Sequence, residues 1–310
     1  MGKHEASRAP NNRTVKLDPS DIGRLEALIL NGPKAGSETL SKIVFGDAFE
    51  ILPELGSGRF DLLFADPPYN LTKEFGISTF REKSDEDYEA WLESWISLCV
   101  PLLKPTASVY ICGDWRSSGS IQRIGSKYFK LRNRITWERE KGRGAKANWK
   151  NAAEDIWYFT VSDDFTFNLD AVKQRRRVLA PYKDNGQPKD WDETADGKFR
   201  DTHPSNIWTD ITVPFWSMSE NTDHPTQKPE KLLAKIILAS TNKGDLILDP
   251  FAGSGTTAVV AKKLRRKFVA VEADENYCLL AAKRLEMAES DSSIQGFEHG
   301  VFWERNSGKK

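Results

Sequence analysis

The sequence predicts an α/β protein with a doubly wound, mostly parallel sheet. Short apolar runs that suit buried strands alternate along the chain with segments whose apolar residues recur at helical spacing. Several runs stop at or beside an acidic residue, namely Asp47, Asp66, Asp249 and Glu272. Ligands of open α/β sheets bind at the carboxyl ends of the strands, so we expect the chemistry at that edge.

Length and composition indicate a globular chain with a real core. The 310 residues, 39% of them hydrophobic, suffice for one large domain or two. No apolar stretch approaches the ~18 residues of a membrane span, and the N-terminus has no apolar signal core, so we expect a cytoplasmic protein. Cys99, Cys112 and Cys278 lie in apolar patterns and are expected to be buried free thiols, and no Cys/His spacing indicates a metal site.

Residues 1–40 are expected to form a polar tail and one short helix. The first twenty lack apolar periodicity, whereas the apolar residues between 22 and 29 recur at helical spacing. Residues 42–45 predict a strand, and the pattern over 49–55 predicts a helix. Asp47 lies between these two elements, where it is placed to cap the helix.

A stiff turn follows the strand predicted over residues 60–65. It has the sequence Asp66-Pro67-Pro68-Tyr69-Asn70. Each proline fixes its own φ, lacks a backbone donor and pushes the preceding residue toward an extended conformation, so carbonyls there are free to accept. The Asp66 carboxylate, the Pro67 carbonyl and the Tyr69 ring suit a planar base that bears an exocyclic amino group. The alternative is a proline-rich turn without chemistry.

The middle of the chain continues the alternation of strands and helices. Ser84 and Asp87 resemble a capping box, with Asp in place of the usual Glu, and Pro105 is expected to stop the helix that follows. The tryptophans on its apolar face are interpreted as core rather than as a stacking site. The elements expected here are a loop over 71–83, the helix from 84, strands over 107–112, 131–137 and 155–161, and a helix over 117–127.

Residues 138–221 interrupt this pattern and predict an irregular insertion. They hold an arginine run at 175–177, many turn-forming residues and five tryptophans. Between Arg116 and Lys150, eleven basic residues stand against two acidic ones, a net charge of +9 in a chain whose formal net charge is zero. Such a stretch is typical of a phosphate-contacting surface, and a solvated helix face is the alternative.

Two motifs follow the insertion. The first is His224-Pro225-Thr226-Gln227-Lys228-Pro229, which leads into a helix. The second is the turn Asp249-Pro250-Phe251-Ala252-Gly253-Ser254-Gly255-Thr256-Thr257, which joins a strand over 245–248 to another helix. Its small residues let the backbone approach a ligand closely, and the start of a helix offers unpaired N–H groups.

An acid at the end of the next strand suits a ribose. This strand, over 268–271, ends in Glu272, nineteen residues after Gly253, where a carboxylate can accept from ribose hydroxyls. Dinucleotides and S-adenosylmethionine both carry a ribose. The third glycine of a dinucleotide turn would fall at Ala258, which weakens an NAD interpretation, although alanine is sometimes allowed there. A helix over 274–289 and a tail, packed on the core or on a second subunit, complete the chain.

Together these motifs resemble those of the beta class of amino-group DNA methyltransferases. The chain carries Asp-Pro-Pro-Tyr at 66–69, His-Pro-Thr-Gln-Lys-Pro at 224–229 and Phe-x-Gly-Ser-Gly-Thr-Thr at 251–257, in that order. The resemblance covers residues 42–289 and implies a sheet of the S-adenosylmethionine-dependent methyltransferase type with an irregular target-recognition insertion. It implies methylation of adenine N6, or alternatively cytosine N4, of a base flipped out of duplex DNA. Asp at the first position favours adenine.

The resemblance also implies the roles of residues and regions. The catalytic set would be Asp66, Pro67, Pro68 and Tyr69. The cofactor-binding set for S-adenosylmethionine would be Asp47, Gln227, Lys228, Pro229, Asp249, Phe251, Ala252, Gly253, Ser254, Gly255, Thr256, Thr257 and Glu272. The regions would be a tail with a short helix (1–40), a catalytic half (41–137), a mainly target-recognition region (138–221), a cofactor-binding half (222–289) and a C-terminal tail (290–310).

Other function classes stay open at this point. RNA and protein methyltransferases carry related catalytic tetrads but usually place the cofactor turn first, and an NAD-dependent enzyme would show no methyl transfer. A binding protein with a dead site ranks last, because every motif is intact. The resemblance implies double-stranded DNA as the partner, a homodimer as a common assembly, and a bacterial, archaeal or phage-encoded enzyme at the nucleoid, as in restriction–modification.

Overall fold

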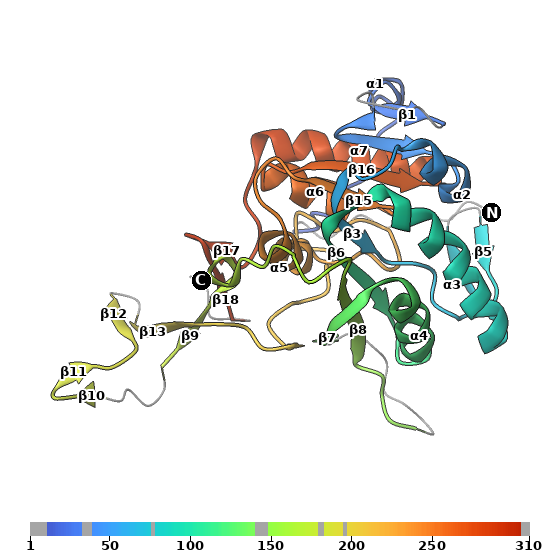
Figure 1. Cartoon of the computed structure of the whole chain (residues 1–310). Coiled ribbons are helices and arrows are strands. Elements are labelled where there is room, and N and C mark those ends of the chain that lie inside the picture. Colours follow the sequence, from blue (N-terminus) through green and yellow to red (C-terminus); the bar gives the residue numbers. More distant parts are fainter. Residues whose placement is uncertain are drawn as a thin grey trace.

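The computed structural model describes residues 11–32, 39–75, 78–139, 148–178, 183–194 and 197–304. At its centre lies a nine-stranded sheet (Figure 1). In spatial order its strands are β1 (Ile29–Asn31), β2 (Lys42–Phe45), β16 (Lys267–Glu272), β15 (Leu246–Asp249), β3 (Phe60–Ala65), β6 (Leu103–Gly113), β8 (Ala153–Thr160), β7 (Lys130–Glu138) and β14 (Ile207–Trp208). Neighbouring strands are parallel except where β8 pairs with β6 and β7, so the predicted mostly parallel sheet is confirmed.

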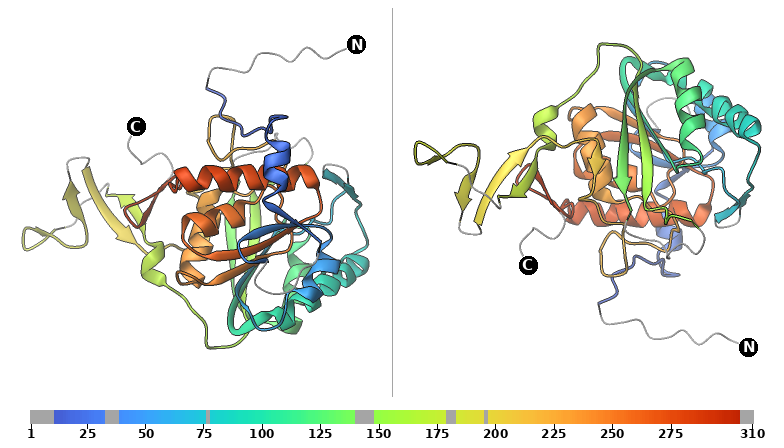
Figure 2. Two further views of the ribbon diagram at one scale, coloured as in Figure 1. Left: turned by 90° about the horizontal axis from the view of Figure 1, so that it is seen from above. Right: turned by 90° about the horizontal axis from the view of Figure 1, so that it is seen from below.

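Helices cover both faces of this sheet (Figures 1 and 2). Those on one face are α2 (Ala48–Ile51), α3 (Asp85–Cys99) and α4 (Ser118–Tyr128), and those on the other are α5 (Glu230–Ser240), α6 (Thr256–Lys263) and α7 (Glu275–Ser290). Along β3, Leu62 and Phe64 join one core while Leu63 and Ala65 join the other, as the strand period of two requires. Within the described ranges, no helix is long and apolar enough to cross a membrane.

Side-chain caps fix the starts of several helices. The Ser84 hydroxyl accepts from the Asp87 N–H at 3.1 Å, which confirms the predicted cap of α3. The Asp47 carboxylate accepts from the Phe49 N–H at 2.9 Å and caps α2. Asp274 caps α7 in the same way. Each cap satisfies a backbone donor that the helix itself leaves unpaired.

The tryptophans of α3 and the cysteines lie in the core, as expected. Trp95 is fully buried, and Trp91 packs against the rings of Phe80 and Phe251. All three cysteines are buried and free. The apolar face of α3 therefore serves packing.

Three local expectations were wrong. The helix expected over 22–29 is α1 (Ile22–Glu26), and Ile29 instead pairs with Ile43 in the sheet. The loop expected over 71–83 contains a hairpin of β4 (Lys73–Phe75) and β5 (Ser78–Phe80). Pro105 does not end α3, because a turn of 3₁₀ helix and the start of β6 precede it. It lies where the β3–β6 register shifts, so no ladder donor is needed there.

The insertion contains more regular structure than its pattern predicts. A five-stranded sheet forms from β12 (Asp192–Thr194), β13 (Gly197–Thr202), β9 (Gln174–Arg177), β18 (Val301–Trp303) and β17 (Phe297–Glu298). Beside it, β10 (Lys183–Asp184) and β11 (Gln187–Pro188) form a hairpin whose turn residues Asn185 and Gly186 both have positive φ. These strands project from the main body (Figure 2). The C-terminal tail supplies two of them and buries Phe302 in the core.

Candidate active site

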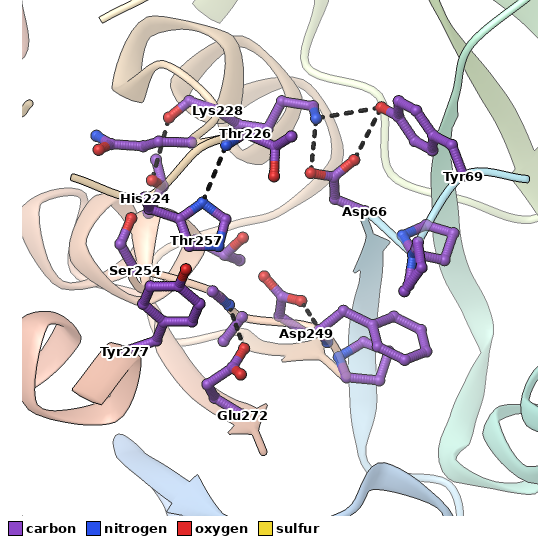
Figure 3. A pocket seen from close by; sticks show the side chains of 18 of the residues that line it. Asp66, Tyr69, His224, Thr226, Lys228, Asp249, Ser254, Thr257, Glu272 and Tyr277 are labelled. Carbon is purple, nitrogen blue, oxygen red and sulfur yellow. Dashed lines mark hydrogen bonds and ion pairs between the residues drawn. The ribbon is translucent and has the colours of Figure 1, made fainter. Parts of the chain in front are cut away.

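A cavity of about 460 Å³ opens at the carboxyl ends of β2, β3, β15 and β16 (Figure 3). The turn after β3 supplies residues 66–69 to its wall, and the turn after β15 supplies residues 249–254. Asp47 follows β2, and Glu272 ends β16. Because β15 lies directly beside β3, the sheet brings together turns that are far apart in the sequence.

All but two of the predicted site residues line this cavity. The exceptions, Pro229 and Gly255, lie at the starts of helices α5 and α6. Pro229 precedes α5, and its carbonyl accepts from the Leu232 N–H at 3.1 Å. Gly255 begins α6 with a φ of +76°, and a Cβ there would lie 2.5 Å from the Cβ of Ala281 on α7. Gly255 therefore allows α6 and α7 to pack closely.

Hydrogen bonds hold the turn after β3 on both sides. The Tyr88 hydroxyl of α3 donates to the Pro68 carbonyl at 3.0 Å. The Asn70 amide group exchanges two hydrogen bonds with the Lys83 backbone, and its own backbone N–H donates to the Ser117 hydroxyl. Among the described residues, the Pro67 carbonyl accepts no hydrogen bond. The turn is thus fixed while the acceptor predicted at Pro67 stays available.

Charged side chains converge on Asp66. The Lys228 ammonium lies 2.6 Å from Asp66 Oδ2 and 3.4 Å from Glu154 Oε2. The Tyr69 hydroxyl lies 3.0 Å from Asp66 Oδ1 and 3.1 Å from the same Glu154 oxygen, while Arg139 pairs with the other Glu154 oxygen. Sequence reasoning placed Lys228 with the cofactor group and missed Glu154 and Arg139. The group contains two carboxylates and two cations, so it is balanced in charge.

Burial and these neighbours set the charge state of the group. Burial lowers the pKa of Lys228, but the Asp66 and Glu154 carboxylates outweigh this effect and hold the pKa above its usual value. Burial raises the pKa of Glu154, but Lys228 and Arg139 bring it below its usual value. Burial raises the pKa of Asp66 more than Lys228 lowers it, and Glu154 adds to the rise. Lys228 is therefore an ammonium and Glu154 a carboxylate at neutral pH.

The glycine turn and Glu272 form the other end of the cavity. Glu272 accepts from the Gly253 N–H at 2.7 Å and from the Asp274 N–H at 2.9 Å. Asp249 accepts from the Phe251 N–H at 3.0 Å, and burial raises its pKa to about 7. Each carboxylate oxygen has two lone pairs, so both side chains keep acceptor capacity toward the cavity.

Residues of the His-Pro-Thr-Gln-Lys-Pro segment divide between the cavity and its wall. The Gln227 carboxamide bonds back to Thr222 and to the Glu220 carbonyl, so it shapes the loop. His224 packs edge-on against Tyr277, with ring centroids 4.4 Å apart, and burial lowers its pKa to about 3. His224 is therefore neutral at physiological pH. Neither His224 nor Tyr277 was predicted as a site residue, although both line the cavity.

The basic stretch is largely paired within the chain. Residues 140–147, which include Lys141, Arg143 and Lys146, lie outside the described residues. Seven of the other eight form the pairs Arg116–Glu82, Arg123–Glu89, Lys127–Glu93, Lys130–Asp163, Arg132–Asp163, Arg134–Asp155 and Arg139–Glu154, and Lys150 is exposed. On α4, Arg123 and Lys127 tie the helix to α3, which favours the solvated-face interpretation there. Phosphate contact by the rest of the stretch stays a prediction.

A family comparison agrees with this geometry. Residues 60–283, which include both turns of the cavity, match the N6_N4_Mtase model, described as DNA methylase. The chain belongs to this family. In this methylase, the two turns that the match includes line a single cavity.

Relatives of the methylase match it over most of its length. It is 37% identical over 257 residues to the DNA adenine methyltransferase YhdJ of Escherichia coli K12, a match that covers 79% of this chain and 83% of the relative. It is 36% identical to the type II methyltransferase M2.DpnII of Streptococcus pneumoniae, over 81% and 91% of the two chains. It is 32% identical to the type II methyltransferase M.HpaI of Haemophilus parainfluenzae, over 83% and 76%.

Solved structures share the fold of the methylase. The PvuII cytosine-N4-specific DNA methyltransferase aligns with a TM-score of 0.56 at 18% identity, over 84% of this chain and 92% of the other. TTHA0409 of Thermus thermophilus, in complex with S-adenosyl-L-methionine, aligns with a TM-score of 0.53 at 22% identity, over 86% and 99%. These alignments show that the fold is shared over most of the chain and not only at the two turns.

Proposed function

We propose that this DNA methylase transfers the methyl group of S-adenosylmethionine to N6 of an adenine flipped out of duplex DNA. The observation that carries the proposal is the pairing of two acceptors, the Asp66 carboxylate and the open Pro67 carbonyl, across one cavity from the glycine turn. The name of one relative, the DNA adenine methyltransferase YhdJ, supports adenine as the target. Asp at the first position of the tetrad supports the same choice.

The catalytic steps follow from the chemistry of the turn. The Asp66 carboxylate and the Pro67 carbonyl accept the two amino hydrogens, which draws the nitrogen lone pair out of conjugation. Methyl transfer would then be a direct in-line displacement, in which the bond to the nitrogen forms as the bond from the methyl group to the sulfonium sulfur breaks and the demethylated thioether leaves. The Asp66 carboxylate would accept the proton that the nitrogen loses. Flipping the base costs a few kcal/mol, and stacking on the Tyr69 ring would return ~1–3 kcal/mol.

The other end of the cavity fits S-adenosylmethionine, the cofactor of this family. A volume of about 460 Å³ lies in the range of small-molecule sites. At Gly253, an added Cβ would lie 2.9 Å from His224 Nε2, so only glycine leaves this part of the wall open. Glu272 would hold the ribose hydroxyls, Asp47 would lie near the adenine ring, and the segment from His224 would border the methionine part. The bound cofactor supplies the electrophilic methyl group.

The remaining assignments belong to the same proposal. Residues 138–221 would supply most of the target recognition, because the strands β9 to β13 among them project from the body and carry exposed basic side chains such as Arg177, Lys183 and Arg200. A homodimer and action at the nucleoid, in the cytoplasm, would follow the pattern of the family. Cytosine N4 is the second candidate, since the family covers both amino groups and a cytosine-N4 enzyme shares the fold.

Nucleoside analysis of host DNA tests this proposal. DNA from cells that express the chain is digested and compared by mass spectrometry with DNA from cells that lack it, and single-molecule sequencing locates the modified bases. We expect N6-methyladenine at one short sequence. N4-methylcytosine in its place would refute adenine alone, and unmodified DNA despite cofactor binding by the purified protein would refute DNA as the substrate.

A further inference from the structure

The Lys228 ammonium occupies one of the two acceptors proposed for the target amino group, the Asp66 carboxylate. Its Nζ lies 2.6 Å from Asp66 Oδ2 and 3.2 Å from the Tyr69 hydroxyl (Figure 3). The target amino group would use this same carboxylate. The Lys228 side chain is 6% exposed, so the ammonium belongs to the wall of the cavity.

Each oxygen of Asp66 has a hydrogen-bond donor without a substrate. One of its oxygens accepts from Lys228, and the other lies 3.0 Å from the Tyr69 hydroxyl. A target amino group needs one of these two oxygens as an acceptor. A target amino group that takes the position of either donor on Asp66 must displace that donor before the base can bind productively.

Glu154 offers a second acceptor to both donors. Its Oε2 lies 3.4 Å from Lys228 Nζ and 3.1 Å from the Tyr69 hydroxyl. Its other oxygen pairs with Arg139, and the residue is 4% exposed, so its position is fixed. The hydroxyl has a single proton and can donate to only one of the two carboxylates at a time. A small movement therefore lets Lys228 and Tyr69 exchange Asp66 for Glu154 without leaving a buried ammonium unpaired.

We propose that Lys228 is a placeholder for the target amino group, which holds Asp66 while no base is bound and moves onto Glu154 when the base enters. This inference rests on the proposed function. Lys228 and Glu154 are then positioning residues, because both act on the base through Asp66. The exchange keeps the buried charges balanced in the empty and in the loaded state.

The proposal predicts that replacement of Lys228 and replacement of Glu154 shift the pH profile of activity in opposite directions. Asp66 must be a carboxylate to accept the amino hydrogen, so activity is lost as pH falls through the pKa of Asp66. Lys228 lowers that pKa and Glu154 raises it. The other ionisable groups near Asp66 include Tyr69, Lys73, Tyr88, Cys112, Arg139 and Asp249. These groups are the same in both variants, so the pKa of Asp66 is still expected to shift in opposite directions when Lys228 and when Glu154 is replaced.

The test compares Lys228→Met and Glu154→Gln with the wild-type enzyme. The measurements are kcat and KM for methylation of plasmid DNA across pH, and binding of S-adenosylmethionine by calorimetry. We expect the acid limb of kcat/KM to move up in pH in Lys228→Met and down in Glu154→Gln, each by about one to three units. Glu154→Gln should also raise KM for DNA more than it lowers kcat, since Lys228 then stays on Asp66.

Two control variants remove ion-paired side chains far from the cavity. Lys104→Met breaks a pair with Asp61, and Glu93→Gln breaks a pair with Lys127. Neither should move the acid limb. If Lys228→Met does not fold, Glu154→Gln, which preserves the shape of the side chain, still decides the matter through its downward shift and its KM effect.

Other results would overturn the placeholder. An unmoved acid limb in both variants, or movement in the same direction, would show that the ammonium does not compete at Asp66. Loss of cofactor binding in Lys228→Met with an unmoved limb would make Lys228 a cofactor ligand. A wild-type enzyme that binds S-adenosylmethionine but methylates no DNA would refute the proposed function itself, and the placeholder with it.

Discussion

At the scale of single residues, Gly253 defines the cofactor end of the cavity. Its φ of +52° is one that side-chain-bearing residues rarely adopt, and its N–H donates to Glu272. A Cβ at this position would meet the His224 ring at 2.9 Å. His224 in turn packs against Tyr277, so it has little room to withdraw. A larger residue would therefore displace the wall against which the cofactor is proposed to bind.

Substitutions at two glycines with positive φ distinguish a loss of cofactor binding from a general effect of backbone strain. Gly253→Leu should weaken binding of S-adenosylmethionine on the order of tenfold or more, equivalent to ~1.4 kcal/mol or more. The matched control is Gly58→Leu, because Gly58 has a φ of +64° with nothing within 4 Å of an added Cβ. Calorimetry should show normal binding in this control. Equal affinity in both variants would mean that the glycine turn serves the fold alone.

The charged group around Asp66 shows why sequence reasoning missed part of the site. The Asp-Pro-Pro-Tyr turn was predicted because its residues are adjacent in the chain. Lys228 lies 162 residues from Asp66, and Glu154 lies 85 residues from Tyr69. Glu154 is an acid in an otherwise largely apolar strand, which is a signal of a buried polar role, but its partners depend on the pairing of β8 with β6.

At the scale of elements, the first turn of α3 supports the turn after β3. Ser84 caps this helix, and Tyr88 one turn later donates to the Pro68 carbonyl. Lys83, just before the cap, exchanges two hydrogen bonds with Asn70. Fraying of this helix end would therefore loosen the catalytic turn from both contacts.

Removal of the cap should affect stability and catalysis together. Ser84→Ala is expected to lower the free energy of unfolding by about 1 kcal/mol and to lower kcat, whereas Ser84→Asp should keep both. The control is Ser97→Ala, at an exposed position inside the same helix. Urea unfolding and initial methylation rates provide the measurements. A Ser84→Ala variant that loses stability but keeps full kcat would argue that α3 does not hold the turn.

Elements with a long, regular pattern were predicted well, and short ones were not. The strands that flank both motifs were recognised as apolar runs, and the helices by apolar residues at helical spacing. The hairpin β4–β5 and the strands β9 to β13 consist mainly of polar residues, so they contain no apolar run that would indicate a buried strand. Ile29 has helical spacing, yet it pairs with Ile43, because sheet pairing at the edge overrides the local pattern.

At the scale of the whole molecule, the two halves of the methylase share one sheet. Strands β15 and β16 from the C-terminal half lie between β2 and β3 from the N-terminal half. The glycine turn and the Asp-Pro-Pro-Tyr turn therefore leave neighbouring strands and face one cavity. Neither half can complete the site alone. We infer that this single cavity keeps cofactor binding at one end and acceptance of the amino group at the other.

The Asp66→Ala variant tests most directly whether cofactor binding and acceptance of the amino group occur at different ends of the cavity. Calorimetry gives its affinity for S-adenosylmethionine, and a single-turnover assay with DNA gives its rate of methyl transfer. We predict an affinity close to that of the wild-type enzyme and no detectable transfer, because the carboxylate acts only at the amino-group end. Retained transfer, or loss of cofactor binding in a folded variant, would contradict this division.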